Sequence, residues 1–128
     1  MSQKKKGASV GASELPIMFS IENSNRHELF ITSTAAGLSD LTSEIESLTA
    51  SSPNCKEFMS KYKKAGAETV VEIRVKWGAA GRDAKTWPAN TVLTEENTEA
   101  VLMMIERGGG LGRDVLEVKL KGQDKGGE

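Results

Sequence analysis

Residues 68–77 read Glu-Thr-Val-Val-Glu-Ile-Arg-Val-Lys-Trp, the most regular pattern in the chain. Apolar side chains at 71, 73, 75 and 77 alternate with charged side chains at 72, 74 and 76. A period of two residues is typical of a β-strand with one buried face. The pattern therefore predicts a strand in a sheet that has one covered face and one face open to water.

Three other segments share this alternation. Pro16–Ile21 and Leu29–Thr34 flank a stretch rich in Asn, Ser and charged residues, which is typical of a turn. We therefore expect these two strands to form a hairpin. Asp114–Lys121 alternates in the same way and is predicted to be the last strand.

Helical spacing separates the hairpin from the central strand. Apolar residues recur every three or four positions over residues 38–48, which predicts a first helix. Ser52 is suited to cap a second helix and Pro53 to occupy its first position. An apolar stripe over residues 55–62 continues this helix, and Gly66 is expected to end it.

A third helix is predicted after the central strand. Thr94 is expected to cap it, and its inner face is formed by Val101, Met104 and Ile105, with Leu102 and Met103 widening that face. The glycine-rich run Gly108–Gly112 ends the helix. That run leaves a helix and enters a strand, which is the reverse of the order in a phosphate-binding loop, so we interpret it as a connection.

Together these elements predict an α+β fold. It has a single mixed β-sheet with helices packed on one face, in the order β-β-α-α-β-α-β, which also suits a β-grasp-like sheet. The final strand–helix–strand unit is expected to be a right-handed crossover that makes its two strands parallel neighbours. Residues 15–121 are expected to form one globular domain, with flexible polar tails at 1–14 and 122–128.

Composition excludes several classes of protein. The 128-residue chain has a formal net charge of −1, one histidine (His27) and one cysteine (Cys55). Lone residues of these types predict no catalytic set, no metal site and no cofactor site. No apolar run approaches the ~20 residues of a membrane span. We therefore expect a soluble intracellular protein, cytoplasmic or nuclear, that is not an enzyme and has no membrane partner.

The segment Gly78–Asn90 is the best candidate site. It is a loop of about a dozen residues, which is long for a compact domain. It carries Arg82, Lys85 and Trp87, and Trp and Arg dominate the energetics of protein interfaces. The alternative is that Trp87 folds back and covers the open end of the sheet.

A second candidate is a basic stripe on the open sheet face. It comprises Arg74, Lys76, Lys119 and Lys121, if the strands that carry them are neighbours. Basic sheet faces bind single-stranded nucleic acids when aromatic side chains are interleaved. Here Glu72 and Glu117 interrupt the stripe, and the sequence pI is about 5.9.

The sequence therefore favours a small protein-interaction or self-assembly module. Its partner would be another protein or a second copy, held at a sheet edge or face and at the Trp87 loop. The alternative function is nucleic-acid binding through the basic stripe, the Trp87 loop and the Lys4–Lys6 run.

Overall fold

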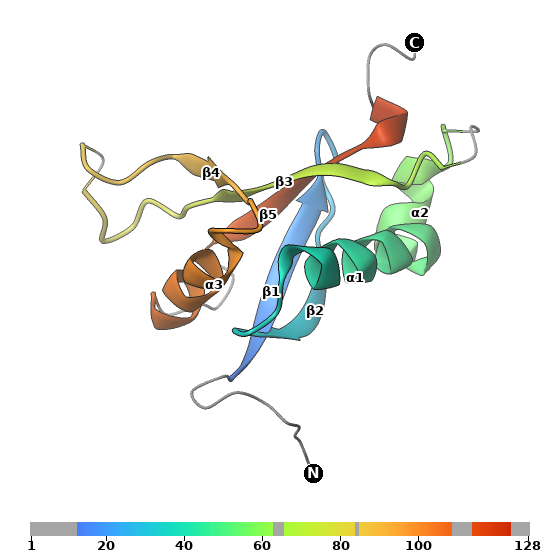
Figure 1. Ribbon diagram of the computed structural model, residues 1–128. Helices are drawn as coiled ribbons and strands as arrows, with labels where there is room; N and C mark the ends of the chain where they lie inside the picture. The colour runs from blue at the N-terminus through green and yellow to red at the C-terminus, as the bar shows by residue number, and fades with distance from the viewer. Residues whose placement is uncertain (1–12, 63–65, 84, 109–113, 124–128) are drawn as a thin grey trace.

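A computed structural model describes residues 13–62, 66–83, 85–108 and 114–123. The elements run β1 (Glu14–Ile21), β2 (Glu28–Ser33), α1 (Leu38–Ser51), α2 (Pro53–Met59), β3 (Val70–Lys76), β4 (Asn90–Val92), α3 (Thr98–Arg107) and β5 (Val115–Leu120), and a 3₁₀ turn follows at Lys121–Gln123 (Figure 1). The predicted α+β class, with one mixed sheet, is confirmed. Most of the two predicted tails lies outside the described residues.

The strand order across the sheet is β2-β1-β5-β3-β4. β1 and β5 lie side by side and parallel at the centre, whereas the other three neighbouring pairs are antiparallel. The predicted hairpin is present, with Ile17 opposite Phe30. This central parallel pair, flanked by antiparallel strands, is the arrangement of a β-grasp-like sheet.

One prediction of strand direction is wrong. β3 and β5 are neighbours, as expected, but they run antiparallel rather than parallel. The reason is β4, a strand of three residues at Asn90–Val92 that the sequence pattern did not reveal. Because β4 pairs antiparallel with β3, the chain reverses direction once more before α3 returns it to the sheet.

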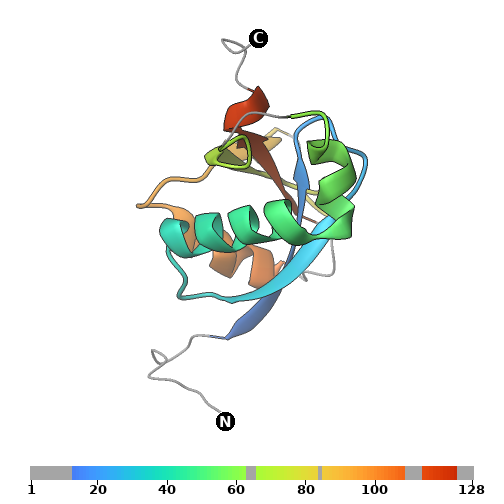
Figure 2. The same cartoon turned by 90° about the vertical axis from the view of Figure 1, so that its right-hand side faces the viewer.

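All three helices pack on the same face of the sheet (Figure 2). The core side chains alternate along the strands, so that Phe19 of β1, Val75 of β3 and Leu116 of β5 are fully buried together with Leu41 of α1 and Leu102 of α3. The intervening strand residues form the opposite face, which no described helix covers. The predicted division into a covered and an open face is confirmed.

Ser52 joins α1 to α2 as the sequence predicts. Its backbone N–H donates to the Leu48 carbonyl and ends α1, while its Oγ accepts from the Asn54 N–H and begins α2. α2 is shorter than expected, because it ends at Met59 rather than near Gly66. Gly66 instead has a φ of +82°, a conformation that glycine adopts at little cost.

Two apolar residues point outward where the sequence pattern predicts burial. The pairing of β3 with β5 is irregular between Val70 and Glu72, where the register shifts. Val71 lies at this irregularity and is 50% exposed. On α3, Met104 is 41% exposed, whereas Leu102 on the predicted flank is fully buried.

α3 begins at Thr98, one turn later than the expected cap at Thr94. Thr94 forms a separate turn with Asn97, in which each residue's backbone N–H donates to the other's side chain.

Candidate functional site

The segment between β3 and β4 is a long hairpin arm rather than an open loop. Beyond the last ladder residues, the Trp77 N–H still donates to the Ala89 carbonyl, so the two strands stay paired. A turn at Asp83, whose carbonyl accepts from the Trp87 N–H, then folds the arm back. The Trp77 and Trp87 rings meet edge to face, with centroids 5.6 Å apart. Trp87 is half-buried.

A buried ion pair holds the base of this arm. Arg82 donates to both carboxylate oxygens of Asp114, at 2.6 and 3.1 Å, and their side chains are only 8% and 0% exposed. The same Asp114 carboxylate accepts from the Gly78 N–H, and Arg82 also donates to the Gly78 carbonyl. The hydrogen bonds to Asp114 raise the pKa of Arg82 despite its burial. This bidentate geometry ties β3, the hairpin arm and the start of β5 together.

The Arg82 guanidinium also lies beside both indoles. Its central carbon is 4.6 Å from the centroid of Trp87 and 5.3 Å from that of Trp77, within the range of cation–π contacts. The Trp77 indole N–H donates to Thr91 Oγ1. The Trp87 indole N–H is buried and has no acceptor among the described residues.

Gly108, at the end of α3, leaves room for this guanidinium. A Cβ there would lie 2.8 Å from Arg82 Nη2, closer than real Cβ atoms approach other atoms, and 3.0 Å from the Met104 carbonyl oxygen, a tight contact. The first glycine of the run is thus a packing position. The rest of the run, Gly109–Gly112, lies outside the described residues.

An open hollow of about 410 Å³ lies between the hairpin arm and α3. We call it the Trp87 groove; it is lined by Gly81, Arg82, Trp87, Met103, Met104, Arg107 and Gly108. A smaller hollow of about 230 Å³ borders Arg82 and Trp87 together with Trp77 and Pro88. Arg107 is exposed and forms no ion pair with any described residue.

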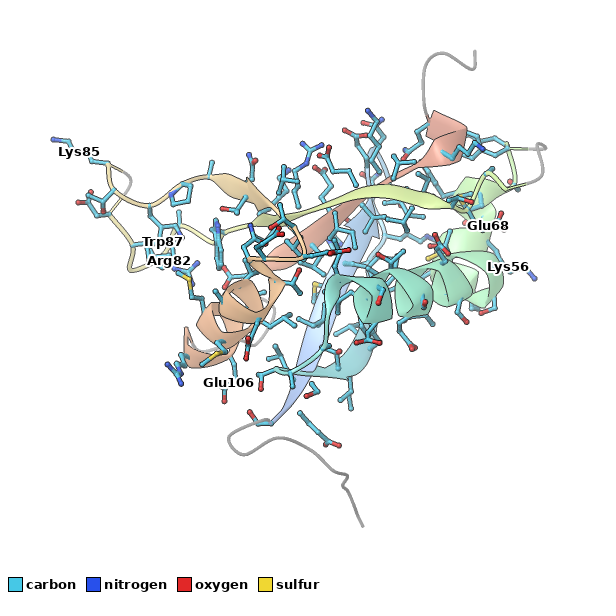
Figure 3. The ribbon with its side chains drawn as sticks, viewed as in Figure 1. Lys56, Glu68, Arg82, Lys85, Trp87 and Glu106 are labelled. Carbon is cyan, nitrogen blue, oxygen red and sulfur yellow. The ribbon has the colours of Figure 1, made fainter. Side chains whose placement is uncertain are left out.

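The three predicted residues of the loop separate in the structure. Figure 3 shows Arg82 and Trp87 together beside α3, whereas Lys85 lies at the tip of the arm and points away. The Arg82 guanidinium is engaged by Asp114. Of the three predicted residues, Trp87 therefore remains as a partly exposed side chain that lines the groove. Sequence reasoning missed Asp114, Met104 and Arg107, because their spacing along the chain gives no sign that they meet.

β3 and β5, which carry the predicted basic stripe, are neighbours, but acidic side chains alternate with the basic ones on these strands. Arg74 lies 2.9 Å from Glu72, 3.7 Å from Glu117 and 4.0 Å from Glu22. Lys76 lies 3.7 Å from the same Glu117. Lys119 sits opposite Glu72 in the β3–β5 register, and Lys121 follows β5 in the 3₁₀ turn.

The lone histidine and cysteine lie far from the groove. His27 is exposed in the β1–β2 turn, and Cys55 is buried on α2. Burial, and secondarily the nearby Glu28 carboxylate, raise the pKa of the Cys55 thiol. Within the described ranges, no three His, Cys, Asp or Glu residues gather as metal ligands. In the same ranges, no helix has the length and apolar character of a membrane span.

Comparisons with family models, curated proteins and solved structures returned no match for this chain.

Proposed function

We propose that this protein is an interaction module that binds an apolar segment of a partner protein in the Trp87 groove. The observation that carries the proposal is the composition of that groove, where an indole and two methionines lie beside Arg107, an arginine without an ion pair to any described residue. Trp, Met and Arg are the side chains enriched in protein interfaces. Methionine also adapts its shape to different apolar surfaces.

The charges at the groove specify the partner's chemistry. Arg82 contributes no net charge, because Asp114 neutralises it. Arg107 is left as the exposed cation at the rim, since it forms no ion pair with any described residue. A segment with a bulky apolar side chain next to an Asp or Glu would fill the apolar part of the groove and place a carboxylate beside Arg107.

The supporting scaffold favours binding over chemistry. The ion pair of Arg82 with Asp114 fixes the hairpin arm, so the groove keeps its shape without a ligand and loses little entropy on binding. That the protein is not an enzyme, and that it acts inside the cell, in the cytoplasm or nucleus, stay predictions.

A peptide library displayed against the intact protein tests the proposal. We expect the recovered peptides to combine a large apolar residue with an adjacent acidic one. Met104→Glu and Arg107→Glu should each weaken binding at least about tenfold in a tryptophan-fluorescence titration. Val71→Glu is the matched control, because Val71 is similarly exposed but lies on β3. Peptides that bind the two groove variants as tightly as the parent protein would refute the proposal.

The same protein should be titrated with single-stranded DNA and RNA. The carboxylates around Arg74 and Lys76 reduce the positive potential of the sheet face, so we expect no salt-sensitive binding. Binding that falls steeply with salt and is lost in a double Arg74→Glu, Lys76→Glu variant would instead favour nucleic-acid recognition.

A further inference from the structure

The outer edge of β2 carries backbone groups that no other described strand uses. The Thr34 N–H donates to the Ser13 carbonyl, which places this pair in the hydrogen-bonded position of the β1–β2 ladder. In an antiparallel pair, alternate residues direct their backbone N–H and C=O groups toward the partner strand. Phe30 and Thr32 therefore also direct these groups toward β1. Leu29, Ile31 and Ser33 therefore turn their N–H and C=O groups away from the sheet, at the end of the strand order.

This edge lacks the usual features that prevent strand pairing. After Glu28 the strand reads Leu-Phe-Ile-Thr-Ser, without charge, proline or bulge. The opposite edge, β4, is only three residues long. Within β2, the outward Leu29 N–H is occupied by the Glu28 carboxylate, at 3.0 Å. The outward Ser33 carbonyl accepts from the Ala36 N–H, at 2.9 Å, whereas the outward N–H and C=O of Ile31 have no hydrogen-bond partner among the described residues.

The side chains beside this edge form an apolar patch on the open sheet face. Leu29 is 53% and Ile31 is 66% exposed, the latter the largest exposure among the large apolar residues described. The register places them directly across from Met18 and Pro16 of β1. An added strand at β2 would therefore extend the sheet and also cover apolar surface.

We propose that the occupant of this edge is a second copy of the chain, which pairs β2 with β2 in antiparallel fashion about a two-fold axis at Ile31. In that register Ile31 exchanges both backbone hydrogen bonds with Ile31 of the second copy, and Leu29 faces Ser33. Glu28 faces Thr34, and His27 faces Ala35, so no like charges are opposed. The sequence of β2 is thus complementary to itself in the isologous arrangement that a two-fold axis requires.

The resulting dimer has one continuous sheet that passes through both copies. The exposed Leu29 and Ile31 side chains of the two protomers become neighbours on its open face. β2 and β4 are opposite edges of the sheet, so the dimer leaves the hairpin arm and the Trp87 groove outside the interface. This inference therefore does not depend on the proposed function, and either can fail alone.

Opposite charges at the two-fold axis give the decisive test. The parent protein should dimerise in sedimentation equilibrium, whereas Ile31→Lys and Ile31→Glu alone should each weaken self-association at least about tenfold, because like charges then face each other. An equimolar mixture of the two variants should restore the dimer through Lys–Glu pairing. Val71→Lys, at a similarly exposed site on β3, should leave the dimer intact.

Hydrogen exchange distinguishes strand pairing from loose apolar contact. The Ile31 and Ser33 amides should exchange more slowly as the protein concentration rises, while the Val71 amide should not respond. A parent protein that stays monomeric up to about 1 mM overturns the proposal. So does a mixture of folded Ile31→Lys and Ile31→Glu proteins that stays monomeric, or a dimer whose Ile31 amide exchanges at the monomer's rate.

Discussion

The open sheet face around Arg74 and the base of the hairpin arm around Arg82 use the same chemistry in opposite surroundings. Arg74 is 27% exposed and shares three carboxylates at distances from 2.9 to 4.0 Å. Arg82 is 8% exposed and has one carboxylate, Asp114, which it binds through two hydrogen bonds. The number of acidic neighbours would suggest that Arg74 forms the stronger ion pair. Burial and bidentate geometry indicate that the ion pair of Arg82 is the stronger one.

The difference teaches that water decides what an ion pair contributes. On the open face, solvent and salt screen the charges, so each contact changes the free energy of unfolding little. At the base of the arm, either partner left alone would be a buried charge without compensation. Replacing the partners in the two regions should therefore have very unequal effects.

The largest effect is expected for Asp114→Ala. It leaves the Arg82 guanidinium buried without its carboxylate and removes the acceptor of the Gly78 N–H. We expect the free energy of unfolding to fall by about 4 kcal/mol, measured by urea denaturation. A loss below about 1 kcal/mol would show that Arg82 reaches solvent easily, and the contrast with Arg74 would disappear.

Gly108→Ala should act on the same pair from the side of α3. The added methyl group would meet Arg82 Nη2 and the Met104 carbonyl, so the guanidinium must shift away from Asp114. We expect a loss of about 2 kcal/mol in stability, a cost typical of overpacking. Gly37→Ala is the steric control, because a Cβ there meets nothing closer than 3.8 Å and only the weaker N-cap of α1, about 1 kcal/mol or less, is expected to reduce stability. Equal losses in the two variants would exclude the steric explanation.

An intermediate effect on stability is expected for Glu28, and it can be tested by changing the pH. Its carboxylate accepts hydrogen bonds from Ser52, Leu29 and Asn54, and these lower its pKa in the folded protein. A lowered pKa stabilises the fold above the unfolded-state value near 4.3 and loses that contribution as pH falls through the folded-state pKa. The stability difference between the parent and Glu28→Gln should therefore shrink from pH 6 to about pH 3 in thermal unfolding. A constant difference would contradict this assignment.

The smallest effect is expected for Glu117→Gln on the open face. It removes one of three carboxylates near Arg74 and the partner of Lys76, all in contact with water. The change in the free energy of unfolding should stay below about 1 kcal/mol and decrease further in high salt. A large loss that salt does not reduce would mean that this face is covered in solution.

The regular segments of the fold could be predicted because their patterns are local. The hairpin, α1, the Ser52–Pro53 start of α2 and the last strand all follow from spacing and capping residues, and the structure confirms them. β4 could not be found, since three residues are too short to show a period. Because β4 was not predicted, the extra reversal of the chain was missed, and β5 was assigned the wrong direction relative to β3.

The candidate site was predictable only in part. Trp87 stands out in any sequence because of its size, and it does line the groove. Arg82 stands out equally, but its role depends on Asp114, a residue 32 positions away. Met104 points outward because of the exact rotation of α3, which a broad apolar pattern over residues 101–105 does not determine.

The centre of the sheet is built from the first and the last strands of the described chain, β1 and β5. During synthesis on the ribosome, β1 leaves the exit tunnel early and then waits, with one side of its backbone unpaired, until β5 follows. Pairing of strands so distant along the chain is intrinsically slow, because a long loop must close first. A nascent chain stopped before Val115 would therefore hold a hairpin and helices without a completed core, a substrate for chaperones until the final strand is released.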